Sequence, residues 1–74
     1  MNAELVGWVI QRKREQKKSS QDVVSDLSGI GRTHLSAIER GERKTTLDTF
    51  FKIAEALNIR PSVLLAEIEE ELNK

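Results

Sequence analysis

The sequence predicts an all-α fold, a compact five-helix bundle that forms a single domain over residues 1–74. Apolar residues recur at intervals of three and four along most of the chain, which is the spacing of one face of a helix. The alternating pattern of strands is missing, and so are hairpin dipeptides such as Asn-Gly. Four glycines and one proline fall mostly between the periodic stretches, where they separate helices.

The five expected helices follow one another closely. They cover about residues 3–17, 21–28, 31–40, 46–57 and 61–72. The apolar positions available to a core are Leu5, Val6, Val9, Ile10, Val24, Ile30, Leu35, Ile38, Leu47, Phe50, Phe51, Ile53, Ala54 and Leu57. The second helix has barely two turns, and so short a helix is stable only when it packs against a neighbour.

Local capping residues predict several helix ends. Ser20 can accept amide hydrogens at the start of the second helix, and Gly29 ends it because glycine readily enters the left-handed region. Thr45 or Thr46 caps the fourth helix in the same way as Ser20. Pro61 suits the first position of the fifth helix, where proline is tolerated.

Composition restricts the kinds of site that this chain can build. With no cysteine and one histidine, it cannot assemble a zinc site from those residues, and we expect no metal or other cofactor. The histidine has no obvious Ser or Asp partner and no glycine-rich phosphate loop is present, so neither an enzyme nor a small-molecule substrate is expected. No apolar run reaches the ~20 residues that cross a bilayer, which predicts a cytoplasmic protein without a membrane partner.

The charged residues are unevenly placed, although the net charge is zero. Residues 1–44 hold nine Lys and Arg against six Asp and Glu, whereas residues 45–74 hold three against six. One end of the molecule can therefore carry a basic face that binds phosphates. The alternative is that these charges are only solvated surface.

Two short helices joined by Gly29-Ile30-Gly31 are the central feature of the chain. Helices joined so tightly cross at roughly 90–120°. In such a unit the first helix can rest on a phosphate backbone while the second enters the major groove of DNA. Leu35 and Ile38 form the inward face of the second helix, and its outward face is polar.

Several motifs along the chain resemble the Cro/repressor (XRE) type of helix-turn-helix DNA-binding family, over about residues 6–65. They are Ser20-Gln21, Gly29-Ile30, Arg32-Thr33, Leu35-Ser36, Ile38-Glu39-Arg40-Gly41, Thr46-Leu47 and Ile53-Ala54-Glu55-Ala56-Leu57. The resemblance implies a lambda-repressor-like fold and a nucleoid-associated regulator of a prokaryote or phage. Part of the third helix is also similar to controller proteins of restriction-modification systems, although the same residues occur in ordinary repressors as well.

The resemblance implies specific roles for residues of this sequence. An Arg at the start of the third helix can bind guanine O6 and N7, and a Thr can offer its methyl group to thymine. The implied base-reading residues are Arg32, Thr33, Ser36 and Ala37. The implied phosphate contacts are Gln21, His34, Arg40, Arg43 and Lys44, with simple capping as the alternative for Gln21 and plain exposure for His34. Arg14 and Glu39 match a salt bridge that ties the first helix to the third.

An apolar stripe near the end of the chain suggests a homodimer. This stripe extends beyond the part of the chain that usually completes such a core, and it consists of Leu65, Ile68 and Leu72. These residues are therefore candidates for a dimer interface, with burial in the core as the alternative. The predicted function is a sequence-specific transcriptional regulator that binds double-stranded DNA as a dimer on a palindromic operator. A protein-interaction module of the same fold is the alternative, favoured by the neutral charge and by the apolar residues Val23 and Leu27.

Overall fold

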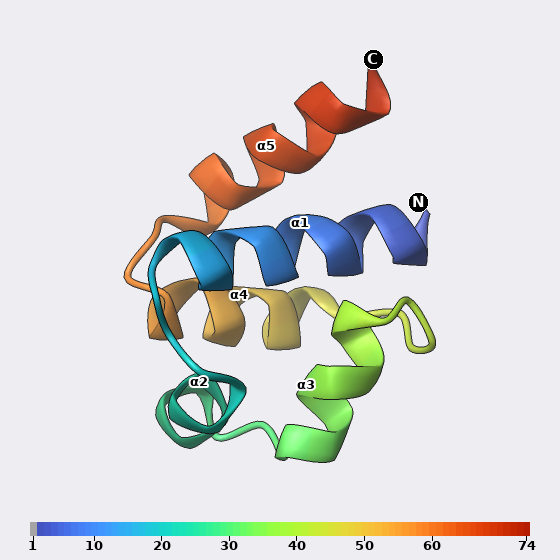
Figure 1. Ribbon diagram of the computed structural model, residues 1–74. Helices are drawn as coiled ribbons and strands as arrows, with labels where there is room; N and C mark the ends of the chain where they lie inside the picture. Colours follow the sequence, from blue (N-terminus) through green and yellow to red (C-terminus); the bar gives the residue numbers. More distant parts are fainter. Residues whose placement is uncertain (1) are drawn as a thin grey trace.

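Five α-helices make up the part of the chain that the computed structural model describes, residues 2–74 (Figure 1). They are α1 (Ala3–Gln16), α2 (Gln21–Ser28), α3 (Arg32–Glu39), α4 (Leu47–Ala56) and α5 (Pro61–Leu72). No strand occurs within these residues, which confirms the predicted all-α five-helix fold. None of the five helices is both long and apolar enough to cross a membrane.

The predicted helix caps are present. The Ser20 hydroxyl oxygen accepts a hydrogen bond from the Val23 amide at 3.1 Å, and Gly29 has a positive φ of 74° at the end of α2. At the start of α4 the cap is Thr46, whose hydroxyl accepts from the Thr49 amide at 3.1 Å. These local interactions explain why helix ends could be predicted from neighbouring residues alone.

Apolar side chains from all five helices meet in one core. α1 packs against α3 and α5, α2 packs against α3 and α4, and α4 packs against α5. In Figure 1, α1 and α4 cross the middle of the view, α5 lies above them, and α2 and α3 lie below. The buried apolar residues are Val6, Val9, Ile10, Val24, Ile30, Leu35, Ile38, Phe50, Ile53, Ala54, Leu57, Leu64 and Ile68.

The structure corrects expectations about which apolar residues face inward, most clearly for Ile68 and Leu47. Ile68, a predicted candidate for the dimer interface, is only 1% exposed and belongs to the core. Leu47, counted among the positions available to the core, is 70% exposed. Both α4 and α5 carry apolar residues on more than one face, so spacing alone does not show which face is buried.

Gly7 allows the backbones of α1 and α3 to approach closely. A Cβ atom at this position would lie 2.1 Å from the carbonyl oxygen of Ile38 and 2.7 Å from that of Glu39. Both atoms belong to the backbone, so they can move away only if a helix shifts. The side-chain-free surface of Gly7 therefore sets the distance between the two helices.

We predict that Gly7→Ala destabilises the protein, by about 1–3 kcal/mol or more, because the added methyl group overpacks a rigid contact. The sign of the change in the free energy of unfolding is informative, because replacing Gly by Ala in an exposed helix interior stabilises a protein by about 1 kcal/mol. Urea denaturation followed by circular dichroism measures the change.

Gly31→Ser is the matched control. A Cβ at Gly31 meets nothing within 4 Å, and Gly31 is the residue that precedes α3 without a side-chain cap. Serine there can cap the helix and should stabilise the protein by a few tenths of a kcal/mol. An increase in stability from Gly7→Ala would contradict the close approach of α1 and α3.

Candidate nucleic-acid interface

The turn between α2 and α3 is held by a small number of hydrogen bonds. The Ser25 hydroxyl donates to the carbonyl oxygen of Ile30, and the Ile30 side chain is buried in the core. Gly29 takes the left-handed conformation that the turn requires. As a result the two helices cross steeply, and Figure 1 shows α2 along its axis and α3 from the side.

The two faces of α3 differ in the way that the sequence predicted. Leu35 and Ile38 are buried in the core. Arg32 and Thr33 at the start of the helix are exposed. The remaining predicted contact residues on α3 are His34, Ser36 and Ala37, and all three are partly exposed.

A buried ion pair joins α1 to α3. Arg14 Nε donates to Glu39 Oε2 at 2.8 Å, and Arg14 Nη2 donates to Glu39 Oε1 at 3.0 Å. The Glu39 side chain is only 2% exposed, and its hydrogen bond to Arg14 raises the pKa of that guanidinium. Arg14 Nη1 also donates to the Ser19 carbonyl oxygen at 3.0 Å. The salt bridge implied by the resemblance is therefore present.

Gln21 extends this ion pair to the first turn of α2. Its amide nitrogen donates to Glu39 Oε1 at 2.9 Å, and its amide oxygen accepts from the Ser36 hydroxyl at 3.0 Å. The N-terminal cap of α2 is the neighbouring residue, Ser20, so the side chain of Gln21 is not the cap. Gln21 thus connects the start of α2 to the middle and the end of α3.

Arg32 interacts with α2 through its neighbour Asp22. Arg32 Nη1 lies 3.0 Å from Asp22 Oδ1, and both side chains are largely exposed. An exposed pair of this kind contributes little to stability. Arg32 also places a positive charge at the positive end of the helix dipole of α3, which is unfavourable. The start of α3 is therefore not optimised for stability.

The three basic residues that follow α3 are not equivalent. Arg40 binds Glu42 through hydrogen bonds of 2.8 and 3.1 Å. This contact raises the pKa of Arg40 and lowers the pKa of Glu42. Arg43 and Lys44 are exposed, and neither takes part in an ion pair with residues 2–74. They are the cations most available to an external anion.

Basic residues of α1 are neutralised by α5. Arg12 lies 3.2 Å from Glu71, and Lys13 lies 3.0 Å from Glu67. The pKa of Glu71 is lowered by its hydrogen bond to Lys74 and also by that to Arg12, against an opposing effect of burial. These pairs join residues far apart in the chain, so local sequence patterns do not predict them. They reduce the excess of positive charge in residues 1–44.

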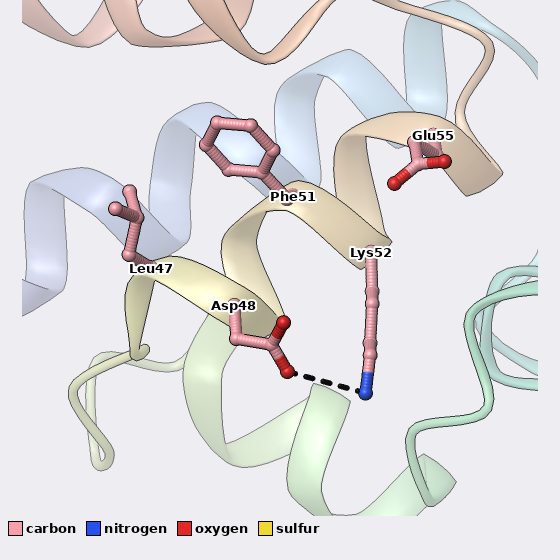
Figure 2. Close-up of a pocket in the computed structure, with 5 residues that line it drawn as sticks. All are labelled: Leu47, Asp48, Phe51, Lys52 and Glu55. Atoms are coloured by element: carbon pink, nitrogen blue, oxygen red, sulfur yellow. Dashed lines mark ion pairs between the residues drawn. The ribbon is translucent and has the colours of Figure 1, made fainter.

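Exposed apolar residues form a continuous surface on α4 and α5. We call it the α4–α5 stripe and define it by Leu47, Phe51, Leu65 and Leu72. Leu47 and Phe51 border a shallow pocket on α4, shown in Figure 2. Leu47 and Leu65 line a second hollow, and Leu65 and Leu72 line a third. Leu65 and Leu72 were predicted for an interface, whereas Leu47 and Phe51, which were counted among the positions available to the core, are 70% and 46% exposed.

Polar groups surround the α4 end of this stripe. Lys52 Nζ lies 3.3 Å from Asp48 Oδ2, and in Figure 2 this pair lies below the ribbon of α4, the Phe51 ring lies above it, and Glu55 lies one turn further along the helix. Among residues 2–74, no group of three or more His, Asp or Glu side chains could hold a metal ion. The pocket is therefore an apolar hollow with a charged border.

In a comparison with known protein families, the sequence matches a helix-turn-helix family over residues 10–64. The chain is 35% identical over 66 residues to the uncharacterized HTH-type transcriptional regulator y4dJ of Sinorhizobium fredii, a match that covers 89% of this chain and 86% of that protein. It is 34% identical over 62 residues to the control protein C.SmaI of Serratia marcescens, covering 84% of this chain and 74% of the relative.

Solved structures of restriction-modification controller proteins have the same fold. C.AhdI from Aeromonas hydrophila is 34% identical, with a TM-score of 0.80 over 84% of this chain and 94% of that chain. C.Esp1396I, solved as a tetramer in complex with its natural 35 base-pair operator, is 27% identical, with a TM-score of 0.92 over 100% of this chain and 97% of that chain.

We predict that Arg14→Met destabilises the protein by about 3–5 kcal/mol, because it leaves the Glu39 carboxylate buried without its cation. The double variant Arg14→Met/Glu39→Met should recover most of this loss, since well-packed apolar residues often replace a buried pair at little cost. Urea denaturation of the two variants measures both values. A double variant as unstable as Arg14→Met would contradict an effect of the unpaired charge.

Proposed function

This chain belongs to the helix-turn-helix family of DNA-binding transcriptional regulators, and we propose that it binds a palindromic operator as a homodimer with α3 in the major groove. The observation that supports this most directly is the α2–turn–α3 unit, which exposes Arg32 and Thr33 at the start of α3 and buries Leu35 and Ile38 behind them. The major groove is wide enough to admit such a helix, and base edges there differ for every base pair.

Within this proposal the side chains of α3 read bases. Arg32 binds guanine O6 and N7, because only one of its nitrogens is taken by Asp22 and other donors remain free. Thr33 and Ala37 supply apolar contacts to thymine methyl groups, and Ser36 supplies a polar contact one turn after Arg32. The unfavourable position of a cation at the start of α3 is consistent with a functional reason for Arg32.

Phosphate contacts come from residues that flank α3. Arg43 and Lys44 are exposed cations, and Arg40 joins them when its exposed pair with Glu42 opens. His34 and Gln21 are further contacts in this proposal, since both lie at helix starts where anions are favoured. Because the side-chain amide of Gln21 is bonded to Glu39 and Ser36, Gln21 contributes its backbone N–H. Phosphate contacts of this kind fix affinity and position without reading sequence.

The homodimer forms through the α4–α5 stripe. Four exposed apolar side chains on neighbouring helices form a surface that a second copy can cover, and contiguous exposed apolar patches are typical of protein–protein interfaces. Assembly of C.Esp1396I as a tetramer on its operator supports an oligomer in a related protein. Two copies place two α3 helices about one DNA turn apart, so the operator is palindromic.

The proposal assigns no enzymatic role to the chain and places it in the cytoplasm of a prokaryotic cell, associated with the nucleoid. The relatives are bacterial transcriptional regulators and control proteins. A controller of restriction-modification genes is the narrower form of the proposal, supported by the similarity to C.SmaI and C.AhdI.

A protein-interaction module of the same fold is the second candidate function. The observation that favours it is an exposed apolar pair on α2, Val23 and Leu27, of which Leu27 is 67% exposed. Such a module would bind no member of a genomic fragment library at low salt, whereas the proposed regulator binds and weakens steeply as salt rises. This comparison separates the two functions.

We predict that Arg32→Ala and Arg43→Ala weaken DNA binding in different ways. In vitro selection from a random DNA pool first identifies the operator. Arg32→Ala should then lose about 1–3 kcal/mol of discrimination at one base pair of each half-site. Arg43→Ala should weaken all sequences alike and reduce the salt slope of log K by about 1 for each phosphate that it leaves unneutralised.

The two variants serve as controls for each other, because each removes one exposed cation. Fluorescence anisotropy with the selected site and with single-base variants measures both the discrimination and the salt slope. Equal losses on every sequence for both variants would show that Arg32 does not read a base.

We predict that Leu65→Asp converts the dimer to a monomer, raising its dissociation constant by about tenfold or more, because it places a charge within an apolar interface. Sedimentation equilibrium measures the change. Leu27→Asp is the control, since it makes the same change at a more exposed leucine on α2, outside the α4–α5 stripe. A Leu65→Asp variant that stays dimeric would move the interface away from this stripe.

A further inference from the structure

We propose that Ser36 contacts DNA only as a hydrogen-bond acceptor, and therefore selects the exocyclic amino group of adenine or cytosine. This inference rests on the proposed function of α3 and adds a direction to one of its contacts. It follows from a hydrogen-bond network that runs from Arg14 through Glu39 and Gln21 to Ser36. In this network each group determines whether the next one donates or accepts.

Arg14 and Glu39 form the first link of this network. Both carboxylate oxygens accept hydrogen bonds from Arg14, at 2.8 and 3.0 Å. A carboxylate in this arrangement has no hydrogen to donate. The atom of Gln21 that lies 2.9 Å from Glu39 Oε1 must therefore be the amide nitrogen.

The orientation of the Gln21 amide then fixes the hydroxyl of Ser36. With its nitrogen toward Glu39, Gln21 presents its amide oxygen to Ser36, at 3.0 Å. An amide oxygen can only accept, so the single hydroxyl hydrogen of Ser36 is donated to Gln21. Two lone pairs remain on Ser36 for a further partner, and no hydrogen remains.

Ser36 is in a position to use these lone pairs. It lies four residues after Arg32 on α3, and residues four apart share one face of a helix. Ser36 is partly exposed, whereas Glu39, which lies about one helical turn further along α3, is buried. The hydroxyl therefore lies between the interior of the protein and the surface that faces the major groove in the proposed complex.

An acceptor in the major groove distinguishes base edges by polarity. Adenine N6 and cytosine N4 are donors, whereas guanine O6, guanine N7 and thymine O4 are acceptors. Binding thymine or guanine through Ser36 would require its hydrogen, and Gln21 would then lose its donor. We expect a preference of about two- to tenfold for the amino-bearing base, the size of one neutral hydrogen bond.

The test uses the operator that selection identifies. Ser36→Ala should relax the preference at one base position of each half-site. Arg32→Ala is the matched control, because it should relax a different position and leave this one unchanged. A modified operator, in which the exocyclic amino group of the base at the Ser36 position is replaced by hydrogen, should bind wild type about two- to tenfold more weakly than the unmodified operator. The Ser36→Ala variant should bind the two operators equally well.

Gln21→Met tests the part played by the network. This variant keeps the Ser36 hydroxyl but removes the acceptor that holds its hydrogen, and Glu39 keeps both hydrogen bonds from Arg14. The hydroxyl can then donate or accept, so the preference at the Ser36 position should fall toward one while other positions keep theirs. A change in overall affinity affects every sequence alike and cancels in this ratio.

Failure of the inference differs from failure of the proposed function. If wild type binds no DNA, the proposed function fails. If wild type binds its operator but Ser36→Ala relaxes no position, or the amino group proves dispensable, the inference is overturned. It is also overturned if Gln21→Met keeps the full preference, because the direction of the Ser36 hydrogen bond would then not depend on Gln21.

Discussion

The buried carboxylate of Glu39 is the interaction on which the arrangement of the helices depends. It lies at the C-terminal end of α3, where the helix dipole disfavours a negative charge, and it is shielded from water. Arg14 joins it to α1 and to the α1–α2 connection, and Gln21 joins it to α2. A buried ion pair is weak evidence for stability. Here its geometric effect is clearer, because three segments are positioned by one side chain.

Gly7 and Arg14 together fix α1 against α3. They are seven residues apart, close to two helical turns, so both lie on the same face of α1. At one end of this face the backbones approach closely because Gly7 has no side chain, and at the other end Arg14 reaches Glu39. Both contacts hold the C-terminal half of α3. Its N-terminal turn, with Arg32, is left free to project from the protein.

The parts of this structure that follow from neighbouring residues could be predicted from the sequence, and the parts that depend on distant residues could not. The caps at Ser20 and Gly29 act within four residues, so their role was visible. Resemblance to a family pointed to the pair of Arg14 and Glu39, but the inward orientation of Gln21 depends on the packing of α2 against α3. Spacing could not show that Ile68 is buried, since α5 is apolar on two faces.

The zero net charge of the chain results from two separate regions, and this decides how it can bind a polyanion. The acidic residues of α5 pair with Arg12 and Lys13 on α1, and in Figure 1 α5 and α3 lie on opposite sides of the molecule. The molecule extends 32 × 23 × 21 Å, whereas charges in physiological salt are screened beyond about 8 Å. The acidic helix therefore has little effect at α3, where Arg43 and Lys44 are free. With so few free cations, one copy binds phosphates weakly. Each phosphate contact adds to the salt-dependent part of the affinity, so a second copy on the same DNA doubles that part.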